Sequence, residues 1–182
     1  MSEIAQRGLT ADDFIAWGMA RPEGERWELA HGEAVAMAPE RAAHGRAKLR
    51  IAEHVSAAVR TAGLPGAVFV DGMAVQVEAT TVYEPDVLMR CGAPLPDNAI
   101  KLTNPVIEVE VVSPSSRTRD SGAKLADYFR IESLCHYLIV RTEDRAVIHH
   151  ALGPDGHILT RIIHDGTVDF GAGLMLDGIF PA

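Results

Sequence analysis

The sequence predicts a mixed α/β fold, and three observations carry this prediction. Residues 41–62 place alanine, leucine, isoleucine and valine at helical spacing, whereas residues 106–112 form a nearly continuous β-branched run typical of a central strand. Short β-rich runs separated by glycine or polar residues occupy much of the remaining chain. The 182 residues fit one domain with a substantial core, so residues 1–182 are expected to form a single domain.

The first elements are expected to be a short helix and a β-hairpin. Thr10 is a suitable N-cap followed by acidic residues, and the helix should end near Gly18. Residues 26–30 and 33–37 flank the dipeptide His31-Gly32, which resembles a two-residue hairpin loop with glycine supplying a positive φ. The chain should therefore carry an N-terminal β-hairpin ahead of its longest helix.

The longest helix, residues 41–62, is followed by the stop signals Gly63 and Pro65. Beyond it, residues 91–105 are typical of a proline-interrupted loop, and residues 118–131 have helical spacing. Strands are expected at residues 67–70, 74–77, 82–89, 106–112, 136–140, 146–150, 158–163 and 167–170.

The composition excludes several classes of protein. The chain is 47% apolar and 23% charged, which is ordinary globular usage and argues against disorder and fibrous structure. No apolar run approaches the roughly 20 residues of a spanning helix, and the first residues lack the basic-then-apolar order of a secretory signal. We therefore expect a cytoplasmic protein without a membrane segment.

The formal net charge of −8 argues against a protein that grips nucleic acid over its whole surface. Any contact with DNA must be local. The stretch from Arg41 to Arg60, which contains Lys48, is rich in basic residues and is one candidate for such a contact. The alternative is an ordinary solvated face of a helix.

Carboxylates stand on the most apolar strand of the sequence. Glu108 and Glu110 are two residues apart, so their side chains should point to the same face of the sheet. If that face is buried, a cation, a basic partner or solvent must compensate their charge. The alternative is a face that is open to water.

A third carboxylate precedes an apolar stretch earlier in the chain. Pro85-Asp86 is followed by Val-Leu-Met, and turn signals separate this stretch from the strand of Glu110. Adjacent strands would bring Asp86 beside Glu110. Two such carboxylates are hard oxygen ligands suited to Mg²⁺ or Mn²⁺, with the remaining positions left for water and a phosphate.

A lysine follows on the predicted second helix. Asp120, Lys124 and Tyr128 recur every four residues and therefore share one helix face. If this helix packs against the strand of Glu110, Lys124 can point at a metal-bound water or a phosphate, with Asp120 or Asp127 holding it in place. The alternative is a surface ion pair that contributes about 0.3–0.5 kcal/mol.

These pieces together resemble the Uma family of putative restriction endonucleases, which belongs to the PD-(D/E)XK nuclease superfamily. The resemblance covers roughly residues 25–150. It rests on Glu33 after Gly32, His44 at the head of a helix, Pro85-Asp86, Pro105-x-Ile-x-Val-Glu110-Val-Val-Ser113-Pro114-Ser115-Ser116, Arg119-Asp120-x-x-x-Lys124-x-x-x-Tyr128 and His136-Tyr137-Leu-Ile-Val.

The resemblance implies a restriction-endonuclease-like fold with a central mixed β-sheet between helices. It also implies that Asp86 and Glu110 bind the metal ion, that Lys124 is the catalytic lysine, and that Glu33 is an additional acid near the metal. The superfamily pattern places lysine two residues after the acid, where this chain has Val112. Residues that could support the metal ligands are Glu108, which matches no family acid, Asp120, Tyr128 and His44.

The resulting hypothesis is a metal-dependent endonuclease that hydrolyses DNA with a metal-activated water. Nucleases of this superfamily often pair two subunits, and two-fold dimers are the commonest oligomers, so a homodimer is expected. One alternative is a non-catalytic module that keeps the nuclease fold and binds DNA or a protein. Another is an unrelated metal-dependent hydrolase acting on a small phosphoester, which the acidic charge balance would tolerate better.

Overall fold

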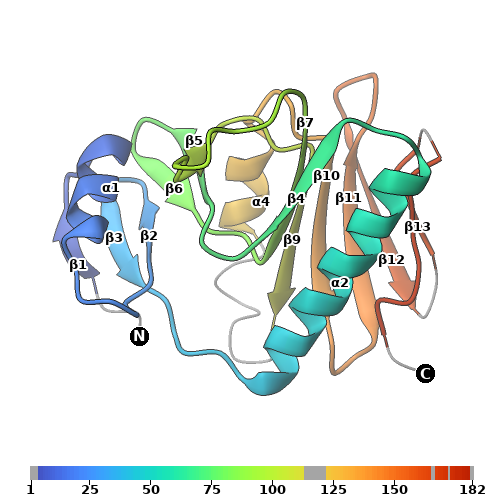
Figure 1. Ribbon diagram of the computed structural model, residues 1–182, viewed down its shortest axis with the longest axis horizontal. Coiled ribbons are helices and arrows are strands. Elements are labelled where there is room, and N and C mark those ends of the chain that lie inside the picture. Colours follow the sequence, from blue (N-terminus) through green and yellow to red (C-terminus); the bar gives the residue numbers. More distant parts are fainter. Residues whose placement is uncertain (1–3, 113–121, 165–166, 172, 181–182) are drawn as a thin grey trace.

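The strands of the computed structural model form two six-stranded sheets and one small two-stranded sheet (Figure 1). The structure describes residues 4–112, 122–164, 167–171 and 173–180. Sheet A contains, in spatial order, β1 (Ile4–Arg7), β3 (Glu33–Ala36), β2 (Trp27–Ala30), β6 (Thr81–Tyr83), β5 (Ala74–Glu78) and β8 (Lys101–Leu102). Sheet B contains β12 (Ile158–His164), β11 (Ala146–Leu152), β10 (His136–Arg141), β9 (Ile107–Val112), β7 (Val87–Cys91) and β4 (Gly66–Val70).

Sheet B is the central mixed sheet that the sequence predicted. Strand β9 pairs in parallel with β10 and antiparallel with β7. Helix α2 (Ala42–Thr61) packs on one face of this sheet, and the short helix α4 (Ala123–Tyr128) lies on the other face (Figure 1). The remaining helix, α1 (Ala11–Met19), packs against sheet A, and β13 (Val168–Asp169) pairs with β14 (Met175–Leu176).

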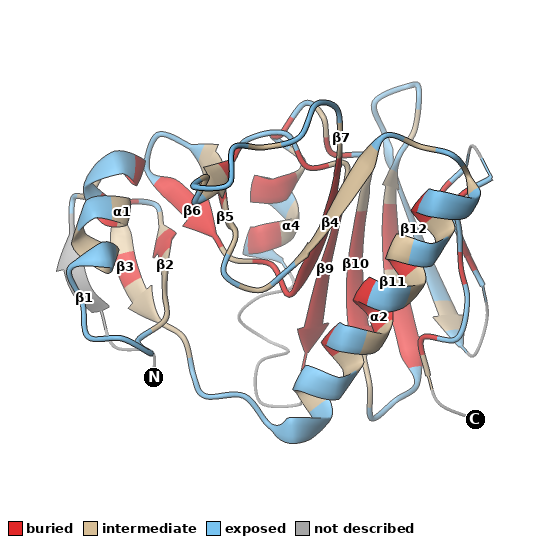
Figure 2. Ribbon diagram, in the orientation of Figure 1, coloured by how far each residue is buried: buried red, intermediate tan, exposed pale blue. Residues whose placement is uncertain are grey.

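Strand β9 is buried along its whole length (Figure 2). Its alternating side chains divide between two cores, because successive residues of a strand face opposite ways. Val109 and Val111 pack with α2, whereas Val112 packs on the side of α4 beside Tyr128. The predicted face that carries Glu108 and Glu110 is therefore the α4 side, and it is closed rather than open to water.

The N-terminal elements form as the sequence predicted. Thr10 caps α1 with a reciprocal capping box to Asp13. Between β2 and β3, His31 has φ 49° and Gly32 has φ 83°, which are the two positive values of a type I′ turn. The hairpin does not stand apart as an extension, because β2 also pairs with β6 and so joins sheet A.

The predicted strand at residues 82–89 is wrong as a single element. It is two strands, β6 in sheet A and β7 in sheet B, because Pro85 has no N–H for a sheet hydrogen bond and restricts the residue before it. The short strands β1, β8 and β14 were not predicted. The predicted helix at residues 118–131 is shorter where it is described, because α4 ends at Tyr128; residues 113–121 lie outside the described residues.

Several chain segments pass from one sheet layer to the other at the same place. Residues 37–41 connect β3 to α2, residues 71–73 connect β4 to β5, and residues 84–86 connect β6 to β7. The second and third segments touch, since the backbone N–H of Asp71 donates to the carbonyl of Asp86. We call these three segments, together with the sheet ends that they join, the junction. None of the described helices is long and apolar enough to cross a membrane.

Candidate active site

Asp86 and Glu110 meet at the junction, as the sequence predicted. The antiparallel register of β7 and β9 pairs Val87 with Val109. One step further along this register, Asp86 lies across from Glu110. Both carboxylates are buried, with exposed fractions of 4% and 8%.

The carboxylate of Asp86 is bound on both of its oxygens. Its Oδ2 atom accepts the backbone N–H of Val111 at 2.6 Å and lies 3.1 Å from Nε2 of His44. Its Oδ1 atom lies 2.7 Å from Nζ of Lys48. Burial alone would raise the pKa of Asp86, but His44, Lys48 and the Val111 N–H outweigh burial and lower that pKa. Asp86 is therefore held as a negative carboxylate at neutral pH.

Glu110 faces α4 and is bound there by two side chains. Its Oε1 atom lies 3.1 Å from Nζ of Lys124 and accepts the hydroxyl of Tyr128 at 2.9 Å. Burial, together with the carboxylates of Asp86 and Glu28, raises the pKa of Glu110 to about 8 against the opposing effect of Lys124. A bound cation would supply a further positive charge and so favour the ionised form of this carboxylate.

Lys124 is buried between the two sheets rather than forming a surface ion pair. Besides Glu110, its Nζ atom lies 2.8 Å from Oε1 of Glu28 and 5.0 Å from the centre of the Tyr83 ring. Burial would lower the pKa of Lys124, but the two carboxylates outweigh burial and raise that pKa well above its usual value. The amine is therefore a fixed positive charge.

Among the described residues, Lys124 contacts an acid that the sequence analysis did not suggest. The sequence suggested Asp120 or Asp127, but Asp120 lies outside the described residues, and Asp127 accepts the hydroxyl of Tyr83 at 2.6 Å. Glu28 on β2 contacts Lys124 instead, and Glu28 itself accepts the backbone N–H of Glu84 at 3.1 Å.

Glu33, the hairpin acid implied by the family resemblance, lies near Glu28. The β2–β3 register pairs Glu28 with Val35 and Ala30 with Glu33, so both acids face the same side of sheet A. The pair that contains Glu33 is two cross-strand pairs closer to the turn than the pair that contains Glu28. Among the two, the structure puts Glu28 in contact with Lys124. Nothing in the local sequence pattern distinguishes them, because the choice depends on how the hairpin packs on the rest of the chain.

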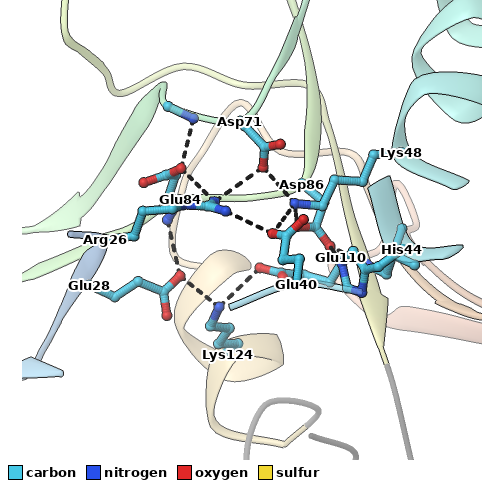
Figure 3. A network of polar contacts seen from close by, with 12 residues as sticks. Arg26, Glu28, Glu40, His44, Lys48, Asp71, Glu84, Asp86, Glu110 and Lys124 are labelled. Atoms are coloured by element: carbon cyan, nitrogen blue, oxygen red, sulfur yellow. Dashed lines mark hydrogen bonds and ion pairs between the residues drawn. The ribbon is translucent and has the colours of Figure 1, made fainter. Parts of the chain in front are cut away.

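Lys48 is a further component that the sequence did not assign to the site. It was part of the basic stretch considered for DNA contact, but its side chain is 1% exposed. Its ammonium binds the carboxylates of Glu40, Asp71 and Asp86 (Figure 3). By contrast, Arg46 is exposed on the opposite side of α2, since residues two apart on a helix are about 200° apart. The basic stretch is therefore not one continuous face.

Arg26 extends the same polar network toward sheet A. Its guanidinium lies 2.7 Å from Glu40, 3.1 Å from Asp71 and 2.6 Å from Glu84 (Figure 3). Each of these acids belongs to one of the crossing segments of the junction, so a single arginine connects all three. The network positions the segment that ends at Asp86.

Glu108 differs from the other acids of the site. Its side chain is fully buried, and neither of its carboxyl oxygens has a hydrogen-bond partner among the described residues. Burial, reinforced by the nearby Glu110 carboxylate, raises the pKa of Glu108 well above its usual value. Burial therefore favours the neutral, protonated form of Glu108 in the folded protein.

The donor groups around Asp86 fit a divalent cation. Potential ligand atoms of Glu40, His44 and Asp86 all lie within 4.8 Å of one another. Carboxylate oxygens completed by waters suit Mg²⁺ or Mn²⁺, and the imidazole adds a nitrogen ligand of the kind that transition metals accept. His44 and Tyr128, whose predicted roles included simple packing, each make a polar contact with one of the two central carboxylates.

Comparisons with known proteins agree with the resemblance inferred from the motifs. The model of the Uma2 family, described as "Putative restriction endonuclease", matches residues 11–178. The fold is similar to that of a crystal structure described as a putative nuclease belonging to DUF820 from Anabaena variabilis. That similarity has a TM-score of 0.69 and 13% sequence identity, and it covers 92% of each chain. No curated protein matches the sequence.

Proposed function

The chain belongs to the Uma2 family of putative restriction endonucleases, and on that premise we propose that it is a metal-dependent nuclease that hydrolyses DNA. One observation carries the proposal. Asp86 in the segment before β7, Glu110 on β9 and Lys124 on α4 converge at the junction, with Lys124 Nζ 3.1 Å from Glu110 Oε1. Two acids and a lysine that converge in this way can bind a cation and a phosphate together.

Asp86 and Glu110 would hold a Mg²⁺ or Mn²⁺ ion, with His44 beside Asp86 as a further ligand or as the residue that orients it. When bound, such an ion supplies a water of lowered pKa and neutralises charge on the scissile phosphate. The donor set supports this assignment, because the buried carboxyl groups of Asp86 and Glu110 offer hard oxygen ligands.

The remaining site residues would act through their own contacts. Lys124 would donate to a non-bridging oxygen of the phosphate and stabilise the charge that develops there. Glu28 and Tyr128 would fix the geometry, since Glu28 contacts the Lys124 amine and Tyr128 donates to Glu110. Glu33 stays a predicted additional acid. No serine or cysteine is required as a nucleophile in this scheme.

DNA is the proposed substrate, and it would be bound through local contacts because the chain carries a formal net charge of −8. A homodimer stays a prediction based on the need to cut two strands. Light scattering at working concentration tests it, and a monomeric mass would contradict it.

Nicking of supercoiled plasmid with Mg²⁺ or Mn²⁺ tests the proposed activity. Wild type should nick the plasmid, whereas Asp86→Ala and Glu110→Ala should not. Glu53→Ala, which changes an exposed acid on α2, is the matched control and should behave as wild type. Cleavage that survives both active-site substitutions would contradict the proposal. Absence of cleavage by every protein would favour a binding module or a hydrolase of small phosphoesters.

A further inference from the structure

Lys48 occupies a cage of carboxylate oxygens beside the proposed active site. Its Nζ atom lies 2.6 Å from Asp71 Oδ1 and 2.7 Å from Asp86 Oδ1, and it also binds Oε1 of Glu40. These acids come from the three crossing segments of the junction. Lys48 reaches them because it lies one helical turn after His44 on α2, and the two residues therefore face Asp86 together.

In this arrangement, every hydrogen-bond donor of the Lys48 ammonium group has a partner. A lysine ammonium has three hydrogen-bond donors, and Lys48 has one carboxylate for each of them. Its side chain is 1% exposed, so it is withdrawn from water and from any phosphate in solution. Lys48 therefore does not contact substrate; its charge is directed at the three acids.

Oxygen atoms of three acids around one point also form the kind of site that takes a divalent cation. Mg²⁺ and Mn²⁺ bind carboxylate oxygens at about 2.0–2.2 Å and keep several waters. Removal of the lysine side chain would leave Glu40, Asp71 and Asp86 without the positive charge that they share. In the structure, a cation already occupies this position, namely the ammonium group of Lys48.

We propose that Lys48 is a built-in counter-ion that takes the place of a second metal ion beside Asp86, so that the site binds a single divalent cation. This inference rests on the proposed function, because it specifies how many ions that function uses. It assigns Lys48 as a positioning residue that acts through Asp86 and not as a residue that touches the substrate.

The two carboxylate oxygens of Asp86 face different positions, one toward the cage around Lys48 and one toward the proposed metal site. Oδ1 faces Lys48, whereas Oδ2 faces His44 and the Val111 N–H. Asp86 is therefore shared between Lys48 and the proposed metal ion, which would approach it from the side of His44. Arg26 also binds Glu40 and Asp71, so the outer part of the cage is neutralised by a second fixed positive charge.

Counting bound Mn²⁺ tests this inference without any assay of cleavage. Mn²⁺ is titrated into DNA-free protein, and the remaining free ion is measured by its electron paramagnetic resonance signal. Wild type should bind one ion per chain, and Lys48→Ala should bind two. Lys48→Arg keeps the positive charge and should bind one. Lys101→Ala removes a lysine that pairs with Asp12 away from the site, and it should also bind one.

A double variant tests whether the additional ion bound by Lys48→Ala lies in the cage. Asp71→Asn in the Lys48→Ala background removes one cage carboxylate and should return the count to one. Lys48→Gln, which preserves more of the side-chain volume, replaces Lys48→Ala if circular dichroism shows that the alanine variant does not fold.

Each outcome separates this inference from the proposed function. An unchanged count in folded Lys48→Ala or Lys48→Gln would overturn the counter-ion role and leave the metal site of Asp86 and Glu110 standing. Two ions in wild type would overturn it as well. No ion in wild type would contradict the proposed metal dependence, and a single ion gained by Lys48→Ala would then still support the cage.

Discussion

Lys124 on α4 donates to Glu28 on β2 across 96 residues of sequence, with Nζ and Oε1 2.8 Å apart. This contact crosses from one sheet layer to the other and fixes the direction in which the amine points. The same Nζ lies 3.1 Å from Glu110 of sheet B. The position of the proposed catalytic lysine therefore depends on how the two sheets pack, and not on α4 alone.

Glu28→Gln should lower kcat for plasmid nicking by about 10- to 100-fold while changing KM little. The neutral amide of glutamine is a weaker acceptor and does not attract the positive charge of Lys124, so the amine is misplaced relative to the phosphate. Steady-state kinetics measure the effect, with Glu25→Gln as a matched control from an exposed position nearby. A larger loss for Glu33→Gln than for Glu28→Gln would favour the acid implied by the family resemblance.

Lys124→Met should reduce cleavage by about 100-fold or more, because it removes a donor to the developing negative charge. Binding of Mn²⁺ should stay as tight as in wild type or become tighter, since a competing positive charge beside Glu110 is removed. Nicking assays and calorimetric Mn²⁺ titration provide the two readouts, with Lys101→Met as the control. Wild-type cleavage by Lys124→Met would show that its assigned role is wrong.

His44→Ala should weaken Mn²⁺ binding by about 10- to 100-fold, which is the usual effect of losing a ligand's supporting contact. The imidazole lies 3.1 Å from Asp86 Oδ2 and belongs to the group of ligand atoms around that carboxylate. Calorimetry with Mn²⁺ measures the change, and His54→Ala, further along α2, is the control. If wild type and His44→Ala bind Mn²⁺ with equal affinity, His44 has only a packing role.

Glu108 should make the folded protein less stable as pH rises. Its pKa in the folded protein is raised above the ordinary value of 4.5, so above that pH the unfolded chain binds fewer protons than the folded chain. The free energy of unfolding then falls with increasing pH, by at most about 1.4 kcal/mol per pH unit for one group. Glu108→Gln removes this contribution.

Urea denaturation in the presence of a chelator, from about pH 5 to about pH 8, measures this effect. The stability of Glu108→Gln relative to wild type should increase steadily over that range. Glu110 contributes a slope of the same sign in both proteins, because its pKa is raised to about 8. Parallel pH profiles for the two proteins would mean that Glu108 is not a buried neutral acid.

Local patterns in the sequence were sufficient for the elements and for part of the site. The capping residues of α1, the hairpin turn at His31-Gly32 and the buried run of β9 are signals within a few residues, and each one forms. The β-turn-β spacing between Asp86 and Glu110 was also enough to place them across from each other. These predictions depended on contacts between neighbouring segments.

Non-local packing decided the rest. Lys48 follows Arg46 in a basic stretch, and only the rotation of α2 against sheet B determines that Lys48 faces inward. The contact between Glu28 and Lys124 depends likewise on the packing of sheet A against α4. Sheet A itself was missed as a layer, because its strands are short and come from segments that alternate with those of sheet B.

The surplus of acids at the junction implies an order of binding events for the proposed function. The network in Figure 3 contains Glu28, Glu40, Asp71, Glu84, Asp86 and Glu110, but its permanent cations are Arg26, Lys48 and Lys124. A nucleic acid that arrives first meets net negative potential and is repelled. With chelator present, DNA should bind weakly, whereas Ca²⁺ should restore binding in a fluorescence anisotropy titration; equal affinity in both would refute this. On the proposed function, loading with cation would then precede capture of the polyanion, and free divalent ion would be the first control on turnover.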